Sequence, residues 1–166
     1  MKNNIILIGM PAVGKSTVGV VVAKRLGYEF IDTDLLIQKQ EKRLLKEIIE
    51  QEGIARFIDI ENDVNKQIQA EKTVIAPGGS VVYCEEAMKH FMEIGTIIYL
   101  KASYDTISKR IDDAQKRGVV LKEGQTFKDL YEERVVLFEK YADIEVCEDG
   151  KEIEETIDDV LEAVEK

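Results

Sequence analysis

One segment near the start of the chain restricts its possible folds more than any other. Residues 9–17 read GMPAVGKST, which contains the pattern G-x-x-x-x-G-K-S. The apolar run NIILIG at residues 4–9 predicts a buried strand before it, and residues 15–26 predict a helix after it. In such a strand–loop–helix unit, backbone N–H groups and the helix N-terminus converge on phosphate oxygens. The segment therefore predicts a nucleoside triphosphate site within an α/β fold.

The individual positions of this loop have physical reasons. Glycine lets the backbone curl, lysine places a positive charge on the β- and γ-phosphates, and the serine hydroxyl can ligate Mg²⁺. Ser16 is therefore a predicted metal ligand, and Lys15 a predicted catalytic residue. The predicted nucleotide-binding residues of the loop are Gly9, Ala12, Val13, Gly14, Lys15, Ser16 and Thr17.

Strands and helices alternate along the rest of the chain. Further strands are predicted at residues 28–34, 73–79, 95–102 and 142–146, and further helices at 35–51, 53–71, 85–93, 103–114, 126–140 and from 152 onward. This alternation is typical of a five-stranded parallel sheet that helices cover on both faces. We expect one domain over residues 1–166, with a mobile loop or lid at the polar segment 112–126.

Composition excludes several classes of function. The chain has 166 residues, 45% of them hydrophobic, which is enough for a full core. Its 23 basic and 33 acidic residues give a net charge of −10, unfavourable for binding nucleic acid or an anionic membrane. No segment has the length of a membrane span or the pattern of a signal peptide, so we expect a cytoplasmic protein.

The nucleotide could serve a switch, a motor or a phosphotransferase. A GTPase switch would show D-x-x-G and N-K-x-D elements, but no aspartate stands three residues before a glycine. The single N-K pair, Asn65–Lys66, continues as QI inside a predicted helix. A motor ATPase needs a longer chain, so a small phosphotransferase is the favoured enzyme.

At this point the sequence resembles the shikimate kinases over nearly its whole length. The similarity rests on GMPAVGKST, on FIDTD at 30–34, on GG at 78–79, on an arginine in the loop 112–126, and on ER with an apolar–aromatic sequel at 133–138. The resemblance implies a five-stranded parallel sheet related to nucleoside monophosphate kinases, with a lid. It implies transfer of the γ-phosphate of ATP, with Mg²⁺, to a hydroxyl of a small carboxylated ring, in aromatic amino acid biosynthesis.

Two aspartates end the second predicted strand, where ligands of open α/β sheets lie. The resemblance implies that Asp32 lies near the Mg²⁺ and that Asp34 binds the acceptor hydroxyl, which it could orient or deprotonate. Either aspartate could instead cap a helix.

Glycines and arginines complete the implied site. Gly78 and Gly79 end the third strand and let an acceptor approach backbone N–H groups. The resemblance implies that Arg134 binds the acceptor carboxylate and that Arg110 stacks on adenine. It also implies that Arg117 arrives on lid closure and stabilises the charge that develops during transfer.

The chain departs from the family pattern at the acceptor. Ile58 stands where a second carboxylate-binding arginine is expected, Ser80 replaces a third glycine, and GVVL follows Arg117 instead of proline and leucine. Three functions therefore stay open: a shikimate kinase, a kinase of the same fold for a hydroxy amino acid or sugar acid, and a non-catalytic ATP-binding regulator. In each case the expected partner is a small molecule and the expected oligomeric state is a monomer.

Overall fold

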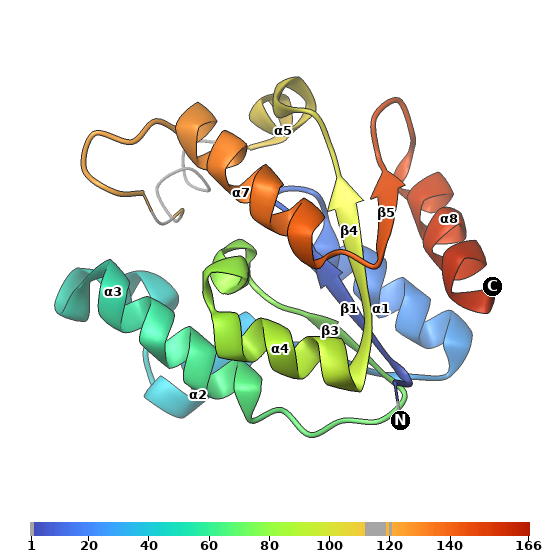
Figure 1. Ribbon diagram of the computed structural model, residues 1–166, viewed down its shortest axis with the longest axis horizontal. Coiled ribbons are helices and arrows are strands. Elements are labelled where there is room, and N and C mark those ends of the chain that lie inside the picture. The colour runs from blue at the N-terminus through green and yellow to red at the C-terminus, as the bar shows by residue number, and fades with distance from the viewer. Residues whose placement is uncertain (1, 112–118, 120) are drawn as a thin grey trace.

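The computed structural model describes residues 2–111, 119 and 121–166, and a single five-stranded sheet organises them (Figure 1). The strands are β1 (Asn4–Ile8), β2 (Glu29–Asp32), β3 (Thr73–Ala76), β4 (Gly95–Lys101) and β5 (Ile144–Cys147). They pair in the order β2-β3-β1-β4-β5, and every pairing is parallel. The predicted five-stranded parallel sheet is confirmed.

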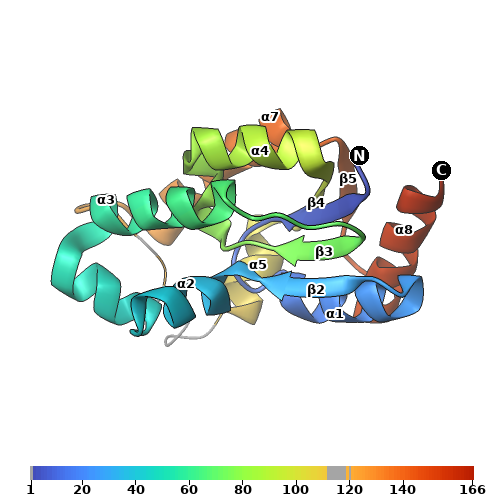
Figure 2. The same cartoon turned by 90° about the horizontal axis from the view of Figure 1, so that it is seen from below.

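Helices cover both faces of the sheet (Figure 2). On one face α1 (Lys15–Leu26) contacts β3, and α8 (Ile153–Glu165) contacts β5. On the other face α4 (Glu85–Ile94) and α7 (Phe127–Tyr141) contact β4. The short η1 (Gly79–Tyr83) and α5 (Tyr104–Arg110) follow β3 and β4. With helices on both faces, the central strands β1, β3 and β4 are almost wholly buried, as their apolar sequences require, while the edge strands β2 and β5 are partly exposed.

The segment between β2 and β3 differs from the expected pair of helices. α2 (Thr33–Glu41) ends early at Lys42, whose backbone is left-handed with φ 55°, and α3 (Leu45–Lys66) then runs through the predicted break. Gly53 has non-helical angles (φ 87°, ψ 168°), so the predicted break is a kink inside α3. The prediction of one helix over 35–51 was wrong because nothing in the local sequence marks Lys42 as a helix end.

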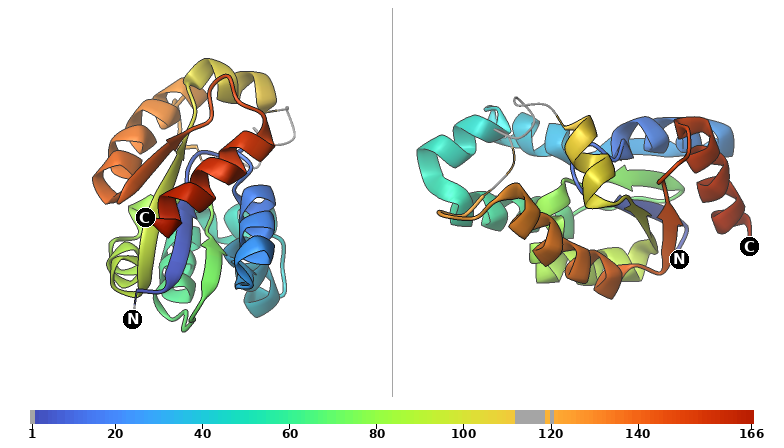
Figure 3. Two further views of the ribbon diagram at one scale, coloured as in Figure 1. Left: turned by 90° about the vertical axis from the view of Figure 1, so that its right-hand side faces the viewer. Right: turned by 90° about the horizontal axis from the view of Figure 1, so that it is seen from above.

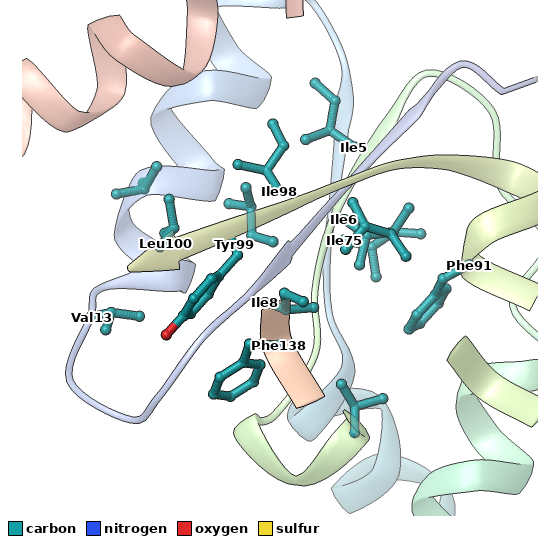
Figure 4. Close-up of a cluster of buried hydrophobic side chains, with 14 of the residues drawn as sticks. Ile5, Ile6, Ile8, Val13, Ile75, Phe91, Ile98, Tyr99, Leu100 and Phe138 are labelled. Carbon is teal, nitrogen blue, oxygen red and sulfur yellow. The ribbon is translucent and has the colours of Figure 1, made fainter. Parts of the chain in front are cut away.

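The core surrounds the central strands (Figure 4). All five residues of β1 are buried, which is why this strand reads as a continuous apolar run rather than an alternating one. On one side Tyr99 of β4 stacks on Phe138 of α7, with ring centroids 5.0 Å apart. This packing fixes α7, and with it the side chains that α7 contributes to the site, against the sheet.

The elements at the carboxyl ends of the strands mark the expected position of a ligand site. α2 and α3 form the end of the molecule opposite both termini (Figure 3). The first turn of α2 and the loops after β1 and β3 follow the carboxyl ends of neighbouring strands, the usual position of a ligand crevice. In the described part of the chain, no helix combines the length and apolarity needed to cross a bilayer.

Candidate active site

A cavity of about 390 Å³ opens where these loops meet. It brings together residues from the loop after β1, the end of β2, α2, α3, the loop after β3 and α7. Its walls include most of the residues predicted from sequence: Ala12, Gly14, Lys15, Ser16, Thr17, Asp32, Asp34, Gly78, Gly79 and Arg134. One continuous space therefore joins the predicted phosphate, metal and acceptor groups.

The loop after β1 has the geometry of a phosphate cradle. Gly14 is left-handed (φ 80°) and forms the N-cap of α1, so the loop turns directly into the helix N-terminus. Lys15 Nζ donates to the carbonyl oxygens of Gly9 (2.8 Å) and Met10 (3.0 Å). Burial lowers the pKa of Lys15 to about 8, against the opposing effect of Asp34. The ammonium group is hydrogen-bonded to neutral carbonyl oxygens, and an anionic phosphate group can replace them as its partner because it attracts the positive charge more strongly.

Ser16 and Asp32 form a part of the site suited to a hard cation. The Ser16 hydroxyl donates to Asp32 Oδ2 over 3.0 Å, so the two oxygen ligands already point to the same place. Asp32 Oδ1 accepts from the backbone N–H groups of Asp34 and Leu35, which makes Asp32 the N-cap of α2. The helix-cap alternative thus applies to Asp32, and its other oxygen is still directed at Ser16. A hydroxyl and a carboxylate beside a phosphate cradle fit Mg²⁺.

Asp34 lies in the first turn of α2 and faces the cavity. Burial, and after it the negative charge of Asp32, raises the pKa of Asp34 to about 6, while Lys15 opposes the shift. A carboxylate with this pKa is ionised at neutral pH and binds a proton more readily than a surface aspartate. This is the property expected of a group that orients and deprotonates a hydroxyl.

Arg134, which was predicted to bind a carboxylate, is a buried cation in the wall of the cavity. Its side chain is 2% exposed, yet it forms no ion pair with any described residue, and its Nε has no hydrogen-bond partner among them. The guanidinium lies over the Tyr83 ring, with Cζ 5.5 Å from the centroid. A methyl group on Gly79 would come within 2.8 Å of Arg134 Nη1, so only glycine leaves this cation its space. A buried, unpaired guanidinium beside a cavity is a binding group for an anion.

Three of the predicted residues that the structure describes do not line the cavity, namely Gly9, Val13 and Arg110. Gly9 contributes its carbonyl oxygen to Lys15, and Val13 is buried in the core behind the loop. Arg110 lies at the end of α5, with Nη1 3.7 Å from Glu148 Oε2. Arg117, and with it most of the predicted lid, lies outside the described residues.

Sequence reasoning missed the apolar wall of the cavity. Leu45, Ile49 and Phe57 of α3 line it, and their spacing in steps of four is the helical signal that could have identified them.

Glu148 is a further titratable group that the sequence did not single out. Burial raises the pKa of Glu148 to about 7, and the neighbouring Arg110 opposes this shift. The described residues contain no group of three or more His, Cys, Asp and Glu side chains that could hold a metal ion.

A comparison with known proteins gives consistent relatives. A family model described as "Shikimate kinase" matches residues 11–165. A shikimate kinase of Thermodesulfovibrio yellowstonii is 37% identical over 98% of this chain and 95% of its own length. One of Clostridium botulinum (strain Alaska E43) is 36% identical over 100% of this chain and 97% of the relative.

Solved structures agree with the described fold. The crystal structure of shikimate kinase from Aquifex aeolicus is 31% identical and superimposes with a TM-score of 0.82, covering 98% of this chain and 96% of that one. A shikimate kinase of Acinetobacter baumannii in complex with shikimate has a TM-score of 0.89 at 24% identity, over 99% and 93% of the two chains. A thymidylate kinase of Candida albicans shares the fold at 14% identity (TM-score 0.62).

Proposed function

This chain belongs to the shikimate kinase family, and from that premise we propose that it transfers the γ-phosphoryl group of ATP to a hydroxyl group of shikimate. Membership makes it an ATP-dependent phosphotransferase with an alcohol group as acceptor. The two alternatives that the sequence left open, another hydroxylated acid or a non-catalytic regulator, are not needed to explain these similarities.

The reaction divides among the residues of the cavity by their chemistry. Gly14, Lys15, Ser16 and Thr17 hold the phosphates, because loop N–H groups and the Lys15 ammonium meet there. Asp34 orients the acceptor hydroxyl and takes its proton as the new bond to phosphorus forms. Gly78 and Gly79 admit the acceptor, Arg110 contacts adenine, and Arg117 belongs to the lid.

Mg²⁺ belongs to this proposal. Ser16 and Asp32 would hold it, because their oxygens already converge. When bound, the ion neutralises phosphate charge as transfer proceeds. The neighbouring Lys15 shares that task, and Asp32 keeps its orientation through the two backbone N–H groups of α2.

The observation that favours an acidic acceptor is the environment of Arg134, and family membership selects shikimate among the acids. An unpaired guanidinium, 2% exposed, is costly to bury unless a ligand supplies the anion. It lines the same cavity as Asp34, so one small molecule can place a carboxylate on Arg134 and a hydroxyl on Asp34. Shikimate carries both groups. A sugar alcohol without a carboxylate would leave the guanidinium unpaired.

The test is acceptor-dependent release of ADP by the purified protein with Mg²⁺ and ATP. We expect phosphorylation of shikimate, with gluconate and homoserine as the competing acceptors and with the phosphorylated product identified by phosphorus NMR. Asp34→Asn should abolish transfer while ATP still binds, and Asp59→Asn, an exposed carboxylate of α3, is its matched control. Faster turnover of gluconate or homoserine than of shikimate would refute the proposed acceptor.

The remaining proposals concern the setting of the enzyme. The net charge of −10 and the sequence pI of about 4.8 support a cytoplasmic protein that binds neither nucleic acid nor anionic membranes. We propose a monomeric single domain over residues 1–166, testable by sedimentation equilibrium.

A further inference from the structure

Two departures from the family pattern meet at one buried carboxyl group. Glu61 of α3 is fully buried, and its Oε1 accepts a hydrogen bond of 2.7 Å from the hydroxyl of Ser80, which stands in place of a glycine. Ile58, in place of the expected arginine, precedes Glu61 by three residues, so an arginine there would share its helix face. In this chain Glu61 has a neutral hydroxyl as its neighbour and no arginine at position 58.

The glycine pair after β3 locates Glu61 relative to the acceptor site. A methyl group built on Gly78 would lie 2.8 Å from Asp34 Oδ1 and 3.1 Å from Glu61 Oε2. One built on Gly79 would lie 2.8 Å from Arg134 Nη1. Because adjacent Cα atoms are about 3.8 Å apart, Glu61, Asp34 and Arg134 surround one dipeptide. Glu61 does not line the cavity, so it acts behind the site rather than on the acceptor.

Glu61 is close to Arg134 but does not pair with it. No ion pair within 4.0 Å joins the two side chains, and among the described residues Glu61 Oε2 has no hydrogen-bond partner. In a fully buried position, an ionised carboxylate whose second oxygen accepts no hydrogen bond has a large desolvation cost. A protonated, uncharged carboxyl has a much smaller one. Burial raises the pKa of Glu61 to about 8.

We propose that Glu61, held uncharged against Ser80, is a positioning residue that leaves Arg134 free to bind the carboxylate of the acceptor. With Ile58 in place of an arginine, Arg134 is the only predicted carboxylate anchor of the pocket. An ionised Glu61 would compete with the acceptor for that single cation. The inference rests on the proposed function, since it assumes an acidic acceptor.

The groups that face Glu61 determine when it ionises. Asp34 of α2 disfavours its charge, Arg134 of α7 favours it, and Ser80 and Cys84 donate hydrogen bonds to it. Burial lowers the pKa of Lys15 to about 8, against the opposing effect of Asp34, so the assay uses saturating Mg²⁺ and ATP to keep the charge of Lys15 constant. The shikimate carboxylate is ionised throughout the neutral and alkaline range.

The experiment measures the KM for shikimate between pH 7 and pH 9 in four proteins. If ionisation of Glu61 near pH 8 prevents binding, the wild-type KM should rise about tenfold over this range, and kcat should change less. The result for each protein is expressed as the ratio of the KM at pH 9 to the KM at pH 7. Glu61→Gln, whose amide cannot ionise, should show a ratio near one. Asp59→Asn, the exposed control on the same helix, should keep the wild-type ratio.

Ser80→Ala provides a second test, because it should shift the pH at which the KM rises in a defined direction. The Ser80 hydroxyl donates to Glu61, and such a bond favours the ionised form. Its removal should move the rise in KM to higher pH, so that the ratio falls below that of the wild type. A shift to lower pH, a tenfold ratio in Glu61→Gln, or a flat wild-type profile would each overturn the inference.

A measurement without substrate separates this inference from the proposed function. The pKa values of Glu148 and Asp34, about 7 and 6, mean that these groups also hold protons at pH 6.5, so the infrared spectrum of Glu61→Gln is subtracted from that of the wild type. The difference spectrum should show the C=O band of a protonated carboxyl at pH 6.5 and none at pH 9.5. If shikimate is not phosphorylated at all, the proposed function fails while this band still tests the charge of Glu61. Absence of the band from the difference spectrum at pH 6.5 would refute the uncharged Glu61 directly.

Discussion

Replacing Arg134 by methionine separates binding from stability in this site. Arg134 is as buried as a core residue, and loss of a large core side chain usually costs about 3–5 kcal/mol. Its Nε, however, has no partner among the described residues, and an unsatisfied buried polar group costs about 1–3 kcal/mol. Removing it recovers this cost and loses the contact with the Tyr83 ring, worth about 0.5–2 kcal/mol.

Because the recovered cost and the lost contact are of similar size, the free energy of unfolding of Arg134→Met should either stay within about 2 kcal/mol of the wild-type value or exceed it. The KM for shikimate should rise roughly ten- to a hundredfold, because a charge-assisted hydrogen bond contributes about 1.5–3 kcal/mol. kcat should change less, since the acceptor carboxylate is bound equally in the ground and transition states.

The assays are urea unfolding without ligands and steady-state kinetics with saturating ATP. Phe138→Ala, one turn further along α7 and fully buried, serves as the packing control and should lose about 3–5 kcal/mol. An Arg134→Met variant as unstable as Phe138→Ala, with an unchanged KM for shikimate, would show that Arg134 is structural and refute the reasoning.

Four other perturbations test the remaining parts of the site. Lys15→Ala should abolish transfer and leave the Tm without nucleotide nearly unchanged, because the hydrogen bonds of Lys15 to described residues go to two loop carbonyls; wild-type turnover would contradict its role. With a pKa of about 6 for Asp34, kcat should fall about tenfold between pH 7 and pH 5, and a flat profile would exclude it as the base. Because native Glu61 holds a proton that the unfolded chain releases above pH 4.5, the free energy of unfolding of the wild type should decrease from pH 5 to pH 8 more steeply than that of Glu61→Gln; equal slopes would argue against the raised pKa. Ile58→Arg should lower the KM for shikimate about tenfold or more by adding a second anchor, and an increase would mean that the α3 alignment is wrong.

Local patterns determined much of this protein. The phosphate loop, the helix over 15–26 and the succession of five strands along the chain follow from residues close together in the chain, whose backbone preferences and periodicity need no distant partner. The same applies to Ser16 and Asp32, because Ser16 lies in the first turn of the helix that follows β1, Asp32 ends β2, and the carboxyl ends of parallel strands meet at one edge of the sheet.

Only the tertiary structure decided how the acceptor side is assembled. The left-handed Lys42 and the kink at Gly53 set the path of α3, and this path brings Glu61 against Ser80. The sequence marks the break at Gly53 but not the left-handed Lys42, because a residue with a side chain rarely adopts that conformation. The unpaired state of Arg134 is likewise a property of everything packed around it: burial, pairing and pKa are sums over neighbours from separate segments, and a linear pattern does not contain those distances.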